Sequence, residues 1–173
     1  MMADLVTKER LLESIRASRD ELLVAASEVP ASRWTEDQYD EGWTARDILA
    51  HLASIEWTYP RILDLADRAR EPEPPKEPPK EPPKEPPKAR PPGLGDYNQR
   101  QVAKRAGATV PELLGEFERN RAATLAAVEE ASEDLLREHV RSAGGVEGTA
   151  AEVLNYLTTI HLLAHLDDIR GTT

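Results

Sequence analysis

A proline-rich tract at residues 71–88 is the feature that most restricts how this chain of 173 residues can fold. It reads EPEPPKEPPKEPPKEPPK and contains four tandem Glu-Pro-Pro-Lys units. The residue before each proline is driven out of the helical region, so we expect polyproline II here, extending roughly 50 Å at about 3.1 Å per residue. Such a tract cannot bury a core, and the core must come from the chain on either side.

Two interpretations of the tract stay open. Its composition favours a solvated, semi-rigid spacer. The recurring Pro-x-x-Pro pattern also fits a docking segment for a proline-binding partner.

Four long helices are predicted from apolar residues that recur at helical spacing, and no convincing strand is found. The helices cover residues 5–28, 44–69, 109–131 and 149–170. Three begin with a threonine followed three residues later by an acid, which is a capping box. We expect a kink near Pro60, which lacks an N–H group, and a short helical turn at residues 96–104.

The connections between these helices predict how they are arranged. The first and last connections are short, as between antiparallel neighbours, whereas the middle connection of about 40 residues can cross a bundle from end to end. We therefore expect an all-α, four-helix bundle in up-down-down-up order. The chain is taken as a single domain, residues 1–173, with a proline-rich insert at 71–92.

Charge and composition exclude several functions. The formal net charge of −10 argues against binding to nucleic acid or to anionic lipid. No run of 18 apolar residues is present and the N-terminus lacks the apolar core of a signal peptide, so we expect a cytoplasmic protein with no membrane contact. Without any cysteine, the chain has neither disulfides nor a thiol nucleophile, so any thiol chemistry needs a small-molecule thiol.

Three histidines form a candidate metal site. His161 and His165 are four residues apart near the end of the closing helix, where positions i and i+4 are neighbours. We place both at the margin of an apolar face predicted to be buried, which comprises Ala150, Val153, Leu154, Leu157, Ile160 and Ala164. If the second and fourth helices pack antiparallel, His51 comes to a similar height, and three neutral imidazoles can hold one metal ion with open positions for water or substrate. The alternative is that these are ordinary surface or partly buried histidines.

Two acids are candidates for orienting these rings through their second N–H groups. Asp47 lies one turn before His51, although a capping role for it is favoured. Asp168 lies three residues after His165, where the alternative is a solvated helix end. His139 has no partner at ligand spacing and is interpreted as a loop residue.

The run Gly-Trp-Thr-Ala-Arg-Asp-Ile-Leu-Ala-His-Leu at residues 42–52 resembles the second-helix signature of the DinB-like superfamily. The segment Asp-Tyr-Asn-Gln-Arg-Gln-Val-Ala from Asp96, the helix start at Thr109 and the closing His-x-x-x-His are also similar. This superfamily takes in the N-terminal domain of mycothiol-dependent maleylpyruvate isomerases and the bacillithiol S-transferases. The likeness covers nearly all of the chain outside residues 70–92.

The resemblance implies a four-helix bundle in up-down-down-up order, often a homodimer. It also implies a divalent metal, zinc or nickel, held by His51, His161 and His165. Characterised members use or transfer low-molecular-weight thiols. The first functional hypothesis is therefore a metal-dependent S-transferase that acts on small electrophiles with a cellular thiol as co-substrate. The alternatives are a non-catalytic bundle that binds metal or a small molecule, and a structural bundle that presents the proline-rich tract to a partner.

Overall fold

The computed structural model describes residues 6–36, 39, 42–71 and 93–171. Nearly all of the proline-rich tract falls outside these ranges, so the polyproline II interpretation and the docking alternative stay predictions. Among the described residues the fold is mostly helical, with one small β-hairpin.

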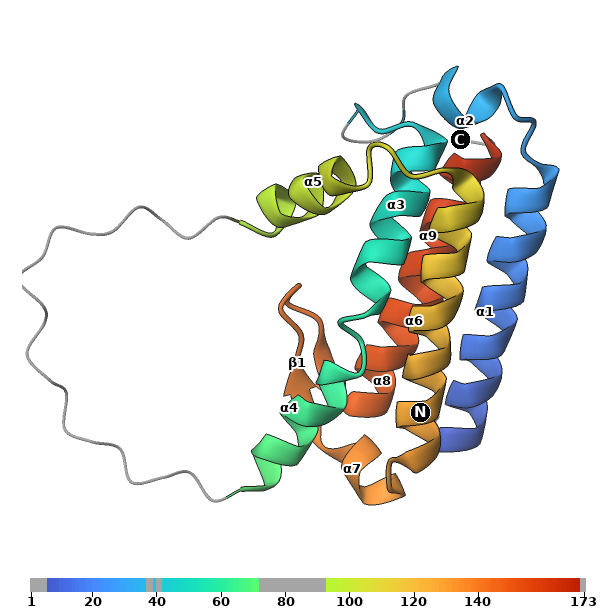
Figure 1. The fold of residues 1–173 in the computed structure, drawn as a ribbon. Helices are drawn as coiled ribbons and strands as arrows, with labels where there is room; N and C mark the ends of the chain where they lie inside the picture. Colours follow the sequence, from blue (N-terminus) through green and yellow to red (C-terminus); the bar gives the residue numbers. More distant parts are fainter. Residues whose placement is uncertain (1–5, 37–38, 40–41, 72–92, 172–173) are drawn as a thin grey trace, which may run out of the picture.

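Four helical runs lie side by side and enclose the core (Figure 1). They are α1 (Lys8–Glu28), α3 (Ala45–Glu56), α6 (Val110–Glu130) and a closing run of α8 (Ala150–Asn155), the π-helix η2 (Tyr156–Ile160) and α9 (His161–Arg170). Helices α1 and α3 each pack on both α6 and α9. Figure 1 shows α1 and α9 running in one direction while α3 and α6 run in the other.

Shorter elements surround the ends of these runs. They are α2 (Arg33–Glu36), α4 (Arg61–Arg70), α5 (Leu94–Lys104), α7 (Glu133–Arg137), β1 (His139–Arg141) and β2 (Glu147–Thr149). Helix α5 packs against α3, whereas β1 packs against α4. In this way α4, α5 and the hairpin lie on one flank of the bundle, as Figure 1 shows.

The three helix starts predicted from capping boxes are confirmed, whereas the first helix begins at Lys8 rather than at residue 5. Thr44, Thr109 and Thr149 each cap a helix reciprocally with an acid three residues later. These boxes satisfy N–H groups that the first helical turn leaves without partners. Near Pro60 a kink was predicted, and the structure instead has a turn that divides the predicted helix into α3 and α4.

The expectation of no strand was wrong. Strands β1 and β2 pair antiparallel, with His139 opposite Thr149 and Arg141 opposite Glu147. Each strand has only three residues, too few for an alternating pattern to stand out in the sequence. The turn between them uses Gly145 at a φ of 85°, a conformation that favours glycine.

The predicted buried face of the closing helix was right only in its first half. Val153 and Leu154 are buried, but Ile160 is 51% exposed and Ala164 is also exposed. From the π-helix onward the buried positions are Thr158, Leu162, Leu166 and Ile169. A π-helix has a wider turn than an α-helix and so shifts the phase of every later residue. An uninterrupted 3.6-residue period could not anticipate this shift.

A buried polar layer separates two apolar clusters in the core. One cluster includes Leu22, Ile48, Phe117 and Leu162, and the other includes Leu11, Ile15, Tyr59, Val128 and Leu154. Each long helical run contributes to the polar layer between them, which consists of Ser18, Glu56, Arg121, Thr124 and Thr158.

The centre of this layer is an ion pair between helices α3 and α6. Arg121 is 0% exposed, and its Nε lies 2.9 Å from Oε1 of Glu56 while its Nη2 donates to Oε2 at 3.0 Å. Burial raises the pKa of the Glu56 carboxyl to about 7, although the Arg121 charge and a hydrogen bond from Thr124 act in the opposite direction. The pair therefore gains its attraction at a large desolvation cost.

No helix among the described residues is long and apolar enough to cross a membrane.

We predict that Glu56→Ala lowers the free energy of unfolding by about 3–5 kcal/mol, because it leaves the Arg121 guanidinium buried without its carboxylate. Urea unfolding followed by circular dichroism measures the change. The control is Glu129→Ala, which removes an exposed ion pair with Arg16 and should cost about 1 kcal/mol or less. Equal losses in the two variants would contradict the importance of the buried pair.

Candidate metal site

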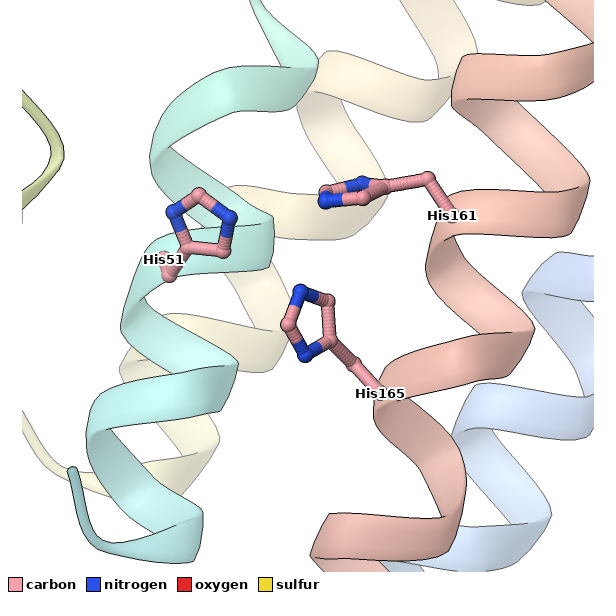
Figure 2. A group of neighbouring side chains, drawn as sticks. All are labelled: His51, His161 and His165. Carbon is pink, nitrogen blue, oxygen red and sulfur yellow. The ribbon is translucent and has the colours of Figure 1, made fainter. Parts of the chain in front are cut away.

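The three histidines predicted to form a site come together in the structure. The ring centroids of His51 and His161 are 5.6 Å apart, those of His51 and His165 are 5.4 Å apart, and those of His161 and His165 are 4.8 Å apart. One nitrogen from each ring lies within 4.8 Å of the other two. Figure 2 shows the three rings facing one another across the space between α3 and α9.

The local sequence explains how this geometry arises. The capping box at Thr44 fixes the start of α3, and His51 follows two turns later on the side that packs against α9. His161 is the first residue of α9, and its main-chain N–H bonds to the carbonyl of Tyr156, five residues back in the π-helix. His165 follows one regular turn later. The antiparallel course of α3 and α9 then brings the rings together.

The surroundings keep two of the rings neutral. Burial, followed by the charges of the other two histidines, lowers the pKa of His51 to about 3. Burial, followed by the charge of His165, lowers the pKa of His161 to about 4. A neutral imidazole carries one N–H group and one lone pair, and the lone pair is what a metal ion binds.

The two candidate acids behave differently. Oδ2 of Asp168 lies 3.6 Å from Nδ1 of His165, within ion-pair range, so this acid can orient the ring. Asp47 caps α3 through Thr44 and pairs with Arg46. The capping interpretation of Asp47 is therefore confirmed.

A divalent metal ion fits this donor set. Among the described residues, Nδ1 of His51 and Nδ1 of His161 are buried without a hydrogen-bond partner. No group in the described part of the chain therefore competes with a metal ion for these two Nδ1 atoms. Zinc–nitrogen bonds of about 2.0–2.1 Å in a tetrahedral site put ligand nitrogens roughly 3.4 Å apart, which small side-chain rotations can reach from the present spacing.

The histidines face two hollows. A cavity of about 900 Å³ has His51 and His161 in its lining and extends between α4, α5, the hairpin and the π-helix. A smaller hollow of about 160 Å³ is lined by all three histidines and by Asp168. The larger volume matches that of typical small-molecule sites.

Two further residues belong to this region. Asn98 of α5 lines both hollows. Trp43, which directly precedes the capping residue Thr44, lies with its ring centroid 5.1 Å from that of His51 and donates from Nε1 to Gln99. It is buried in the apolar cluster and also lines the smaller hollow. No periodic signal connects α5 with α3, so only the fold reveals that Asn98 is a neighbour of the histidines.

The lowered pKa values predict that the metal-free protein loses stability in acid. Above pH 6.5 His51 and His161 are mostly neutral in both the folded and the unfolded state. Below pH 6.5 they take up protons only in the unfolded chain, until the pH reaches about 3 for His51 and about 4 for His161. Each group then costs up to about 1.4 kcal/mol per pH unit. Urea unfolding of chelator-treated protein from pH 7 to 4.5 measures this slope, which should be shallower in His51→Leu. An unchanged slope in that variant would contradict the prediction.

Comparison with known proteins identifies the family. The model of the DinB superfamily matches residues 14–169. The crystal structure of a mycothiol-dependent maleylpyruvate isomerase superposes with a TM-score of 0.68 and 20% identity over 94% of this chain and 60% of that chain. The crystal structure of a histidine-to-alanine mutant of a mycothiol-dependent maleylpyruvate isomerase superposes with a TM-score of 0.63 and 21% identity. That match covers 90% of this chain and 59% of the other chain.

The chain thus spans about three-fifths of the length of these solved structures, and at such identities the likeness concerns the fold alone. No curated protein matches. Because the family model covers most of the chain, including all three histidines, this protein belongs to the DinB superfamily.

Proposed function

We propose that this protein is a metal-dependent transferase that joins a low-molecular-weight thiol to a small electrophile. The observation that carries the proposal is the convergence of His51, His161 and His165 beside a cavity of about 900 Å³. Three imidazole ligands leave other positions of a zinc or nickel ion open, which is typical of catalytic rather than structural sites. The similarity to mycothiol-dependent isomerases supports a thiol as the co-substrate.

The chain supplies the ligands and the binding space. His51, His161 and His165 would hold the ion, and Asp168 would orient the His165 ring through Nδ1. When bound, the ion acts as a Lewis acid that lowers the pKa of a nearby thiol from about 8.5, so that thiolate is available at neutral pH.

The larger cavity would bind the electrophile and the body of the thiol. Its apolar wall includes Ile55, Ile62 and Leu157, which exclude water, and Tyr97 and Asn98 offer polar groups. The thiol sulfur forms a bond to the electrophilic carbon while the bond from that carbon to its leaving group breaks, and the leaving group departs with the electron pair. Asp168, which lines the smaller hollow, is placed to accept the thiol proton and pass it to solvent.

A second candidate function is a bundle that binds metal or a small molecule without turnover. One observation favours it: the carboxylate beside the triad, that of Asp168, is engaged with His165. Fold likeness alone does not separate the two functions. In either case we propose that the helices form an up-down-down-up bundle, with residues 71–92 in the crossover between its second and third helices. We also propose that the protein is a homodimer, and light scattering can test this by measuring its mass.

We predict that the purified protein binds one divalent ion per chain, with zinc or nickel preferred. His161→Ala should retain less than about a tenth of this metal, because it removes one of three ligands. Elemental analysis by mass spectrometry measures the content. His139→Ala is the matched control, since His139 is exposed on β1 outside the triad, and it should keep full occupancy. Equal metal content in the two variants would rule out the triad as the site.

We further predict thiol consumption in the presence of an electrophile such as 1-chloro-2,4-dinitrobenzene. Mycothiol, bacillithiol and glutathione are compared, and the rate should fall at least about tenfold after chelation and return when zinc or nickel is restored. Turnover that survives complete metal removal would contradict the metal-dependent mechanism. Tight metal binding without turnover for any thiol would favour the binding function instead.

A further inference from the structure

The carbonyl of Thr158, inside the π-helix, is bound from two other helices. Arg121 of α6 donates to it from Nη1 and from Nη2, both at 3.1 Å. The hydroxyl of Ser18 on α1 donates to the same oxygen at 2.9 Å. All three residues are almost completely buried. This one oxygen therefore receives three donors that do not come from its own helix.

The position of this oxygen in the closing run is what gives these contacts their importance. Tyr156–Ile160 depart from the regular i→i−4 ladder, and such π turns occur frequently at functional sites. His161 follows directly and bonds back across the turn to Tyr156. The π turn thus sets the phase at which the first of the two α9 histidines leaves the helix. An uninterrupted α-helix would rotate His161 and His165 relative to α8.

Stability alone does not account for an arginine at this depth. Apolar residues of similar volume often replace a buried ion pair at no cost to stability. Here, however, Arg121 also donates to the carbonyl of Ile15 at 3.1 Å and to the hydroxyl of Ser18 at 3.0 Å. Removing the guanidinium would leave the Thr158 carbonyl with Ser18 as its remaining partner on another helix, in the segment where the helical ladder is irregular.

We propose that Arg121 is a positioning residue for the histidine triad, acting by fixing the Thr158 carbonyl and with it the π turn that aims His161. The inference rests on the proposed metal site for its consequence in binding, but its structural content concerns the metal-free chain. Glu56 serves the same purpose indirectly, because it holds the guanidinium in place through two oxygens. Ser18 supplies the second support.

The test compares three variants of the full chain. Glu56→Gln with Arg121→Met removes the charge pair and the guanidinium donors while keeping the volume filled. Ser18→Ala keeps Arg121 but removes the hydroxyl that donates to the Thr158 carbonyl and accepts from Arg121. Thr124→Val is the matched control: it is equally buried and bonds to Glu56 and to the carbonyl of Asn120, but not to Thr158. Circular dichroism and thermal unfolding establish which variants fold.

Three readouts are then taken. Crystal structures of the chelator-treated proteins give the ring separations, which are 5.6 Å for His51 and His161 and 5.4 Å for His51 and His165. Competition with a chromophoric chelator gives the Kd for Zn²⁺, and the visible spectrum of the Co²⁺ form reports ligand geometry. We expect the double variant to displace His161 more than His165, to weaken Zn²⁺ binding at least about tenfold and to alter the Co²⁺ spectrum. Ser18→Ala should weaken binding about threefold, and Thr124→Val should match the wild type.

The outcomes separate this inference from the proposed function. A folded double variant with unchanged ring separations and a Kd within twofold of wild type overturns the positioning role. If the double variant does not fold, Ser18→Ala decides, and a result equal to Thr124→Val overturns the role. If the wild type binds neither ion, the proposed function fails. The crystallographic displacement of His161 then supports the positioning role on its own, and its absence overturns it.

Discussion

The charge pair between Arg121 and Glu56 is the interaction on which the arrangement of this bundle depends. It ties α3 to α6, and through Ser18 and Thr158 it also reaches α1 and the closing run. Apolar contacts are tolerant of small shifts between helices, whereas a buried guanidinium with five bonds to fixed acceptors is not. The layer therefore sets the axial register of all four helical runs, while the apolar clusters on either side of it supply most of the favourable burial.

The same register fixes the axial positions of the three histidines. Glu56 is five residues beyond His51 on α3, about 7.5 Å along the axis, and Thr158 is three residues before His161, about 4.5 Å away. Both helices that supply ligands are thus anchored to the same polar layer within two turns of the rings. A site built on rigid elements holds its ligands more closely than one built on loops.

The sequence predicted what local rules can predict. Capping boxes located the helix starts, and the four-residue spacing placed His161 beside His165 because neighbours on a helix need no tertiary information. The approach of His51 followed from assuming antiparallel helices, and the structure confirms it. The π turn was beyond reach, since its wider turn is stabilised by Arg121 and Ser18 from other helices. Asn98 was missed as a neighbour of the triad for a similar reason: its proximity depends on how α5 packs against α3.

The energetics of the triad argue for a ligand rather than for structure. His51 is 4% exposed, its pKa is driven far down by burial, and its Nδ1 has no partner among the described residues. A buried polar atom left in this way costs about 1–3 kcal/mol, and His161 repeats the pattern. Leucines at these positions would fill the same space and bind the two helices together more strongly. Two buried ring nitrogens without partners among the described residues thus cost stability where apolar side chains would not, which fits a histidine triad that could bind a metal ion beside a cavity.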